Sequence, residues 1–514
     1  MKRRLLRAGS LLLVCVLLGT LCAVPAAGAA GGRFRDVPAK SWAAASIDQA
    51  VDLGLFQGET KDRFGMGHKM TRAAFVVVLC RLFRWEPETP EQGSYRDNQD
   101  RKAWYFSAVE TAYRHGAITA QTDTFRPRDP ITREELAVML VRALGYGTLA
   151  GMVQELPTPF TDVSSNAGYI SVAYRLGIVS GTSKTTFSPT RTATREQAAV
   201  MLVRTYTRYY AAAPVICGAA RIGGQQADHF RGYESVAAEG VRLNASGSLS
   251  ALSGQTAEQA AALCRTIQAS GAKALLLVSG TESALSAPAE TAAASVASRI
   301  SEQAWDGAVL DLAKLPAARQ AELTELVRAL KKALGDKLLY VAAEAPAWRG
   351  TLYGGYDYAA LGAVADRLIL RTQTDSRLSG GTVTSAPLEP LEEVYYALGE
   401  LQGVVPPEKI TLWITTTGNA FSGVNRSGSV SAEEIRQLLD SGAARSYYSE
   451  RYEAAYLVRT VNASQTVVWY HNARSAAARD TLASFFGVGS FFLSDLSSLA
   501  DYPGGGSVRT GLLG

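Results

Sequence analysis

Residues Thr132-Arg133-Glu134-Glu135-Leu136 begin a stretch with helical apolar spacing, and a related phrase occurs three times before residue 200. In each copy an aromatic residue, any residue and an Asp are followed, 34 or 37 residues later, by a Thr-Arg pair. A motif that returns after 61 to 65 residues indicates one supersecondary unit used three times. The copies are Phe34-Arg35-Asp36 with Thr71-Arg72, Tyr95-Arg96-Asp97 with Thr132-Arg133, and Phe160-Thr161-Asp162 with Thr194-Arg195.

Each copy predicts two helices joined by a loop. The first helix ends at a glycine, because glycine readily adopts the left-handed conformation that closes a helix. The second begins at the Thr, whose side chain accepts a hydrogen bond from a free backbone amide. Glu135 and Gln197 complete capping boxes in copies two and three, whereas copy one has Ala74 at this position. The closing glycines are Gly54, Gly116 and Gly177.

The Arg of each pair lies in the first turn of its helix, where a cation opposes the helix dipole. An anion held between the guanidinium and the free helix amides would remove this conflict, which favours an anion-binding role. The alternative is an Arg paired with the Asp of its own repeat. The arginines in question are Arg72, Arg133 and Arg195.

The first 29 residues are typical of a secretory signal peptide. A basic start precedes the apolar run Leu11–Val24 and the small residues Ala27-Gly28-Ala29. We expect the protein to be exported, with no membrane span in its mature form because no later apolar run reaches about 18 residues. Leu21 before Cys22 disfavours a lipoprotein anchor.

Composition disfavours several other classes of protein. The three cysteines after the signal segment predict neither a disulfide framework nor a metal site, and no histidine pair has metal-ligand spacing. Without a phosphate loop or dinucleotide fingerprint we expect no cofactor and no nucleic-acid partner. Residues 31–211 carry 23 Lys and Arg against 18 Asp and Glu, which suits an acidic polymer as partner.

The repeats resemble the S-layer homology family, whose pattern places a Trp about eight residues after the first aromatic. The resemblance implies an all-α, pseudo-threefold bundle whose grooves bind secondary cell-wall polysaccharide, commonly ketal-pyruvylated. It implies that the arginines bind the pyruvate carboxylate and that the Asp and Trp residues complete the grooves. Copy three departs from the pattern, with Tyr169 near the Trp position. The predicted binding residues are Arg72, Arg133, Arg195, Asp36, Asp97, Asp162, Trp42 and Trp104.

The second half alternates strand and helix patterns over about 300 residues, which favours a parallel (β/α)8 TIM-like barrel or an open sheet. Expected strands are Val215–Gly218, Ala274–Val278, Ala308–Leu312, Leu338–Ala342, Arg367–Leu370, Ile410–Ile414 and Gly489–Leu493, and expected helices include Ala257–Ser270, Ala317–Leu334 and Leu391–Leu401.

Three segments resemble glycoside hydrolase family 18, especially its spore-wall, peptidoglycan-directed branch. They are Trp305-Asp306-Gly307 through Asp311, Tyr356-Asp357-Tyr358 followed by Asp366–Leu370, and Val467–Tyr470 with Arg474-Ser475. The resemblance implies that Asp311 steadies the acetamido group of the substrate and that a Glu two residues later protonates the leaving oxygen.

The expected acid is missing, because residue 313 is Ala313. Residues two apart on a strand share a face, so Asp311 and Ala313 point into the same site. The family's pattern has two further elements, an M-x-Y-D strand and a Trp at the end of the last strand. Here Arg371 replaces the Met and Gln373 the Tyr of the first, and Phe491 or Phe492 replaces the Trp. These losses predict a barrel that no longer hydrolyses by this route.

Two carboxylates could have replaced the lost acid. Glu344 and Asp375 each follow a predicted strand and could face the barrel mouth. Trp348, Tyr353 and Tyr356 could stack on sugars there or form a packed loop.

The sequence therefore predicts an extracellular protein in the cell wall or S-layer of a Gram-positive-type bacterium, displaying a glycan-binding or structural barrel. The alternatives are an active hydrolase of peptidoglycan or another N-acetylated, chitin-like glycan, and a spacer without ligand. The expected boundaries are a signal peptide at 1–29, repeats at 34–90, 91–150 and 155–211, a barrel at 214–502 and a flexible tail at 503–514.

Overall fold

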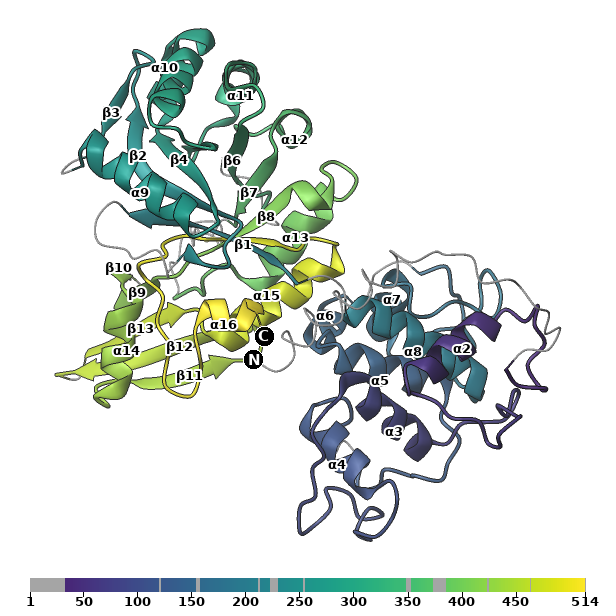
Figure 1. The fold of residues 1–514 in the computed structure, drawn as a ribbon. Coiled ribbons are helices and arrows are strands. Elements are labelled where there is room, and N and C mark those ends of the chain that lie inside the picture. The colour runs from purple at the N-terminus through teal and green to yellow at the C-terminus, as the bar shows by residue number, and fades with distance from the viewer. Residues whose placement is uncertain are drawn as a thin grey trace. The chain divides into compact units, whose positions relative to one another are not determined.

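The computed structural model describes residues 33–119, 122–153, 158–210, 213–221, 230–252, 255–347, 353–372, 385–422, 425–462 and 464–513. The predicted signal peptide lies outside these residues. The chain divides after Ala212 into a helical unit and an α/β unit (Figure 1). Within the described ranges, no helix is long and apolar enough to cross a membrane.

The helical unit contains the three predicted helix pairs. Gly54, Gly116 and Gly177 follow the first helix of each pair and all have φ of +70°, the left-handed conformation expected of them. The short helix α6 between copies two and three was not predicted. The helices are α2 (Ala44–Asp52), α3 (Arg72–Phe83), α4 (Phe106–Arg114), α5 (Arg133–Ala143), α6 (Gly147–Met152), α7 (Ala167–Arg175) and α8 (Arg195–Tyr209).

A closed ring of backbone hydrogen bonds relates the three repeats. The residue before each Thr-Arg pair donates to its counterpart in another copy: Ile131 N to Met70 O at 2.9 Å, Ala193 N to Ile131 O at 2.9 Å and Met70 N to Ala193 O at 3.1 Å. Three equivalent residues that bond head to tail can do so only around a pseudo-threefold axis. The ring confirms the predicted pseudo-threefold bundle.

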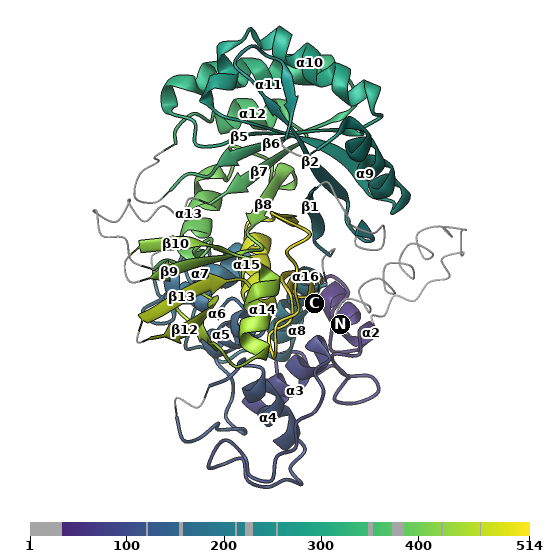
Figure 2. The ribbon, with the colours of Figure 1, turned by 90° about the vertical axis from the view of Figure 1, so that its left-hand side faces the viewer.

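The α/β unit is a closed barrel of eight parallel strands, because β1 pairs with β14 on one side and β2 on the other. Helices cover the outside of these strands (Figures 1 and 2). The strands are β1 (Val215–Arg221), β2 (Ser235–Leu243), β4 (Lys273–Gly280), β5 (Gly307–Leu312), β6 (Leu338–Glu344), β7 (Arg367–Arg371), β8 (Ile410–Ile414) and β14 (Ser490–Leu493). The barrel helices are α9 (Ala257–Ala269), α10 (Ala289–Glu302), α11 (Gln320–Leu334), α12 (Tyr358–Val364), α13 (Leu391–Leu401) and α15 (Ala473–Phe485).

A five-stranded antiparallel sheet is inserted between β8 and α15, and the sequence analysis did not predict it. The helix α14 (Ala432–Asp440) packs on one face through Ile435, against Leu457 and Val468. Val467–Tyr470, predicted as an element preceding the last strand, belongs to this sheet. Its strands are β9 (Gly418–Ser422), β10 (Asn425–Val430), β11 (Arg445–Ser449), β12 (Ala454–Val461) and β13 (Ser464–Tyr470).

Two further features differ from the expectation. A short strand, β3 (Leu249–Ala251), pairs antiparallel with β2 at the edge of the barrel. The prediction of a flexible tail is wrong for α16 (Val508–Leu513), because Val508 and Leu512 are buried and the helix packs on α15. Glycines at 504 to 506 indicate a break in regular structure, but they do not prevent a packed helix after them.

A buried charged cluster joins the start of α13 to the end of β13 and to α15. His471 Nε2 lies 2.7 Å from Glu389 Oε2, and Thr415 donates to the other oxygen of Glu389 at 2.6 Å. Arg479 is fully buried and donates to the backbone carbonyls of Glu389 at 2.8 Å and Glu453 at 2.6 Å. Its charge compensates that of the buried Glu389 carboxylate.

Candidate functional site

The arginine of each Thr-Arg pair reaches into a loop of another repeat. There its Nε donates to the carbonyl of a buried Phe, and its guanidinium lies over the ring of that Phe. The bonds are Arg72 to Phe125 at 2.7 Å, Arg133 to Phe187 at 2.8 Å and Arg195 to Phe64 at 3.0 Å. The corresponding distances to the ring centroids are 4.8, 4.7 and 5.0 Å.

This arrangement corrects two expectations. The arginines do not pair with the Asp of their own repeat, because each one contacts a different copy. Their backbone amides are not free to hold an anion either, since each donates to a loop carbonyl. These bonds are Arg72 N to Asp129 O, Arg133 N to Arg191 O and Arg195 N to His68 O, at 3.0, 3.0 and 2.9 Å.

The three predicted Asp residues hold the loops that receive the arginines. Asp36 accepts from Phe64 N, Gly65 N and Met66 N at 2.7 to 3.0 Å. Asp97 and Asp162 accept in the same way from the amides of the buried Phe and the following residue. Burial would raise the pKa of Asp36, but these amides outweigh it and lower the pKa; the amide of Phe187 is the main cause of the lowered pKa of Asp162. The Asp residues therefore shape the loops from within.

A groove of about 330 Å³ lies beside Arg133 and draws side chains from all three copies. Trp42 comes from copy one and is 63% exposed, whereas Arg133 of copy two is 3% exposed. Copy three supplies Arg191 and Arg204, both exposed, and no carboxylate is among the described residues that line this groove. The remaining lining residues are Ser180, Gly181, Thr182, Gln197, Val200 and Met201.

A second groove, of about 220 Å³, lies beside Arg72 and contains two acids. Glu135 approaches Arg72 Nη1 to 2.6 Å and Arg126 Nη2 to 2.6 Å, so its carboxylate already pairs with the cations. Glu134 also lines this groove and accepts from Ser165 at 2.7 Å.

Beside Arg195, the guanidinium donates to Gln57 O at 2.9 Å and lies 3.8 Å from Glu59. Trp104 is 66% exposed, as a residue that contacts a ligand would be.

At the barrel mouth, Asp311, Glu344 and Arg371 come together from β5, β6 and β7. Arg371 Nη2 lies 2.7 Å from Asp311 Oδ2, and its Nη1 lies 3.1 Å from Glu344 Oε1. The guanidinium lies over the ring of Trp413 at 4.3 Å from the centroid, and Trp413 stacks on Phe492. One guanidinium therefore binds two of the three carboxylates that the sequence suggests for hydrolysis, Asp311 and Glu344.

Burial affects the charges at this mouth. It raises the pKa of Glu344, and Arg371 offsets only part of that effect. It would lower the pKa of Arg371, but Asp311 and Glu344 raise that pKa above its ordinary value. Asp311 Oδ1 is buried without a hydrogen-bond partner in the described structure. The cluster is held together by charge, and its central cation stays protonated.

The other residues predicted at the mouth do not join this cluster in the described structure. Tyr356 is buried and donates to Leu312 O at 2.8 Å, so it packs the loop after β5 and is not available for stacking on a sugar. Tyr353 lies under Lys314 at 5.9 Å. Asp375, Gln373 and Trp348 lie outside the described residues.

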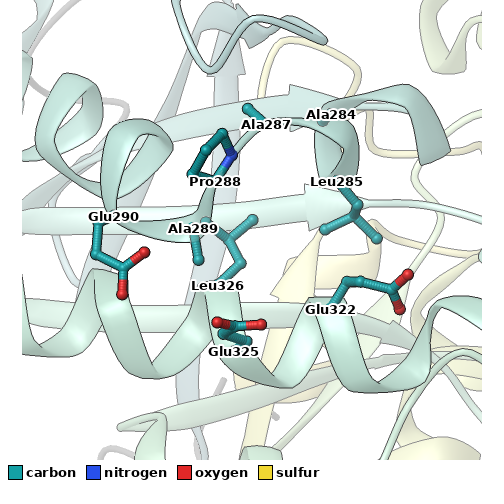
Figure 3. A pocket seen from close by; sticks show the side chains of 9 residues that line it. All are labelled: Ala284, Leu285, Ala287, Pro288, Ala289, Glu290, Glu322, Glu325 and Leu326. Atoms are coloured by element: carbon teal, nitrogen blue, oxygen red, sulfur yellow. The ribbon is translucent and has the colours of Figure 1, made fainter.

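A smaller pocket of about 150 Å³ lies on the outside of the barrel, where the segment before α10 meets α11 (Figure 3). Glu290, Glu322 and Glu325 surround its apolar floor, and Glu322 already pairs with Arg319 at 3.2 Å. It contains none of the predicted site residues. Neither these three glutamates nor any other group of His, Cys, Asp or Glu side chains in the described ranges is arranged to hold a metal ion.

Family models match both units of the chain. The S-layer homology domain matches residues 33–76, 97–137 and 159–199, and Glycosyl hydrolases family 18 matches residues 224–484. The second match covers half of the chain and includes the inserted sheet and all barrel strands except β1 and β14. The chain belongs to glycosyl hydrolase family 18. It also carries three S-layer homology repeats.

Curated relatives match about a third of this family 18 chain. An S-layer protein of Bacillus thuringiensis subsp. finitimus is 30% identical over 200 residues, 37% of this chain and 24% of the relative. An endoglucanase of Bacillus sp. (strain KSM-635) is 30% identical over 174 residues, 33% of this chain and 18% of the relative. The chain thus spans less than a quarter of the length of either relative.

Solved structures resemble the barrel at low sequence identity. The chitinase from Chromobacterium violaceum ATCC 12472 is 18% identical, with 56% of this chain and 95% of that chain covered and a TM-score of 0.49. The spore cortex-lytic enzyme SleL from Bacillus megaterium QM B1551 is 16% identical, with 67% and 80% covered and a TM-score of 0.49.

Sequence reasoning missed the residues that distinguish the sites of this family 18 chain. Arg371 was noted only as a departure from a motif, and its two carboxylate partners were not foreseen. Arg191 and Arg204 were not singled out. Aligning the copies on their Thr-Arg pairs would have found Arg191, because Asp129 and His68 occupy the same position in the other copies.

Proposed function

We propose that this chain is an exported surface protein held in the cell wall by its S-layer homology repeats, which bind an anionic secondary polysaccharide and display a barrel that does not hydrolyse glycans. The family matches and the S-layer relatives support a wall-surface location in a Gram-positive-type bacterium. The predicted signal peptide agrees with export.

One observation carries the anchoring proposal: the groove beside Arg133 collects three arginines and an exposed Trp without a lining carboxylate. Such a groove attracts a negatively charged chain, and guanidinium groups suit carboxylates or phosphates because of their planar donor geometry. Trp42 offers a flat surface for a sugar ring.

Anchoring can be tested with purified wall sacculi before and after acid removal of the polysaccharide. We expect the full chain to sediment with intact sacculi and to stay in solution with stripped ones. The double variant Arg191→Ala plus Arg204→Ala should lose most binding without unfolding, since both side chains are exposed. Arg96→Ala plus Arg101→Ala, which removes the same charge from exposed positions outside this groove, is the matched control. Equal binding to both kinds of sacculi would contradict the proposal.

For the barrel, the supporting observation is that Arg371 binds Asp311 and Glu344 together while Ala313 offers no acid. A general acid must reach the leaving oxygen with its proton, and Glu344 is only 3% exposed. We expect the full chain to release no reducing ends from peptidoglycan or chitin oligosaccharides.

The alternative is an active hydrolase in which Glu344 is the acid. Its raised pKa favours this possibility, because burial raises the pKa of many general acids in the same way. Release of reducing ends that Glu344→Gln abolishes would establish this alternative and overturn the non-hydrolysing barrel. Asp375→Asn is the second variant to compare.

A further inference from the structure

The surroundings of Arg72, Arg133 and Arg195 correspond to one another position by position. The residue three before each Thr-Arg pair supplies the carbonyl that accepts from the Arg amide of another copy, which fixes the equivalence of Asp129, Arg191 and His68. The third helical residue is Glu135, Gln197 or Ala74, and the residue seven further along the helix is Arg142, Arg204 or Arg81.

These positions give the grooves different charges. The groove beside Arg133 combines Arg191, Gln197 and Arg204 and has no acid among its lining residues. At the same positions, the copy that faces Arg72 has Asp129, Glu135 and Arg142. These two acids balance the charges of Arg142 and of Arg72 itself. The copy that faces Arg195 has a His, an Ala and one Arg, with Glu59 nearby. Only one of the three sets is strongly cationic.

The residue at the third helical position explains much of this difference. Glu135 accepts from Thr132 N at 2.9 Å with one oxygen and contacts Arg72 at 2.6 Å with the other. Gln197 makes the same cap, accepting from Thr194 N at 3.3 Å, but its second group is an NH2 donor. Beside Arg72, the carboxylate of Glu135 occupies the place that a ligand anion would take. Beside Arg133, the side-chain amide of Gln197 offers a hydrogen-bond donor at the equivalent place.

The guanidinium of Arg133 keeps one nitrogen, Nη1, available for a ligand. Its Nε and Nη2 donate to Phe187 O and Ser180 O at 2.8 Å each, and no oxygen of the described residues pairs with Nη1. Burial and the nearby Arg191 lower its pKa to about 10. The charge of Asp162 acts on Arg133, but that carboxylate accepts from Phe187 N and Ser188 N and forms no ion pair with the guanidinium. A buried cation without a direct ion pair gains from a ligand anion.

The second cation stands at a defined spacing along α8. Gln197, Val200, Met201 and Arg204 follow the spacing of one helix face, and all line the groove. Seven residues of helix span about 10 Å. Arg204 has no ion-pair partner among the described residues. The groove therefore contains Arg133 and Arg191, whose backbones are hydrogen-bonded just before α8 begins, and Arg204, which lies about two helical turns further along α8 than Gln197.

We infer that Gln197 opens the groove beside Arg133 to anions, and that the polysaccharide unit bound there carries two anionic groups about 10 Å apart, one against Arg133 and Arg191 and one against Arg204. Trp42 then underlies a sugar ring in the same groove. The inference rests on the proposed anchoring function and names its site and the charge of its ligand.

The test uses the full chain and two synthetic probes in isothermal titration calorimetry. One is a disaccharide with a single pyruvyl ketal, and the other adds a uronic acid on the neighbouring sugar. We expect the dianionic probe to bind about tenfold more tightly at low salt, which corresponds to about 1.4 kcal/mol. Arg204→Ala should abolish that preference, so that the two probes bind with about equal affinity, while binding of the monoanionic probe persists.

A swap of the helix residue tests the role of Gln197. Gln197→Glu should weaken both probes at least about tenfold, because the new carboxylate would pair with Arg133 as Glu135 pairs with Arg72. Glu135→Gln, the matched exchange, should keep or increase binding. Both variants retain a cap that the chain already uses. We therefore expect little change in the thermal midpoint for Gln197→Glu, and a lower midpoint for Glu135→Gln, which loses the ion pairs with Arg72 and Arg126.

Equal affinity for the two probes, or unchanged binding by Gln197→Glu, would overturn this inference even if sacculi still bind the chain. Failure of the unmodified chain to distinguish intact from stripped sacculi would instead refute the anchoring function itself. The two results are therefore distinguishable.

Discussion

Arg133 of the bundle and Arg371 of the barrel are both poorly exposed guanidiniums, and they differ in their partners. Arg133 donates to two backbone carbonyls and meets no carboxylate, whereas Arg371 binds Asp311 and Glu344 at 2.7 and 3.1 Å. No ion pair neutralises the charge of the first, whereas the charge of the second is satisfied by two carboxylates of the protein.

The difference teaches that a buried arginine indicates a binding site only when its partners are known. A guanidinium saturated by carboxylates stabilises its own surroundings, and removing it leaves buried charges without a partner. A guanidinium held by neutral carbonyls keeps its net charge, so it attracts anions from solution.

The largest effect is expected at the barrel. Arg371→Met should destabilise the α/β unit by about 3 to 5 kcal/mol, because Asp311 and the buried Glu344 lose their shared counter-ion. Chemical denaturation measures this change. The triple variant Arg371→Met, Asp311→Asn, Glu344→Gln removes all three charges and should recover most of the stability. A mild effect of the single variant would show that Arg371 is not the counter-ion described here.

Arg133→Ala should cost the bundle about 2 to 3 kcal/mol, through the loss of two charge-assisted bonds to carbonyls and of the contact with Phe187. The cost is smaller than at Arg371 because carbonyls left behind are neutral. Binding to intact sacculi should fall as well. Arg191 is exposed in the same groove, so Arg191→Ala should lose binding with little change in stability. An equal loss of stability in the two variants would contradict a structural role for Arg133 that Arg191 does not share.

Acid should weaken the barrel through the cluster around Arg479, where the carboxylates of Glu389 and Glu453 and the imidazole of His471 are nearby. Burial lowers the pKa of His471 below its ordinary value near 6.5, so below that pH the unfolded chain takes up a proton that the folded chain does not. Stability is therefore full above about pH 6.5 and falls, by at most about 1.4 kcal/mol per pH unit, on acidification.

Glu389 adds to this loss at lower pH. Burial would raise its pKa, but the contact with His471, the hydrogen bond from Thr415 and the charge of Arg479 together outweigh that effect and lower the pKa below the ordinary 4.5. Thermal midpoints measured between pH 8 and 5 test the histidine contribution. His471→Gln should flatten the profile between pH 6.5 and 5, and a variant with the original slope would assign the titration to other groups.

The smallest effect is expected at Trp42. Trp42→Ala should leave stability within about 0.5 kcal/mol, as is usual for surface positions, and should weaken binding to sacculi several-fold. Trp104→Ala, at a residue with nearly the same exposure of 66%, is the matched control and should weaken binding less. Trp413 gives the contrast, because it lies under Arg371 and not in an open groove. Equal losses in the two bundle variants would mean that the grooves are equivalent.

Much of the fold follows from the sequence because its patterns are strong and repeated. The Thr-Arg pairs, the closing glycines and the two capping boxes all stand where the structure places helix ends. Seven of the barrel strands were predicted from apolar runs. The eighth, β2, was missed because Ser235–Leu243 contains Ala, Gly and Glu, which have low strand propensity.

The candidate site was harder to predict, because its decisive contacts join distant segments. Arg371 and Asp311 are 60 residues apart, and Arg195 and Phe64 are 131 residues apart. Sequence spacing shows which residues share a helix face or a strand face, but it does not show which strand ends meet. The inserted sheet was missed for the same reason, since β9 pairs with β13 across an intervening helix.

The ring formed by Met70, Ile131 and Ala193 has a consequence for how the bundle can be rearranged. Each copy forms a backbone hydrogen bond with both other copies, including the third copy with the first. No copy therefore lies at an end of the bundle. Deleting any single repeat would break two of the three links and should unfold the remainder. Moving the chain ends to the junction between two repeats should preserve every link, so the bundle should tolerate circular permutation.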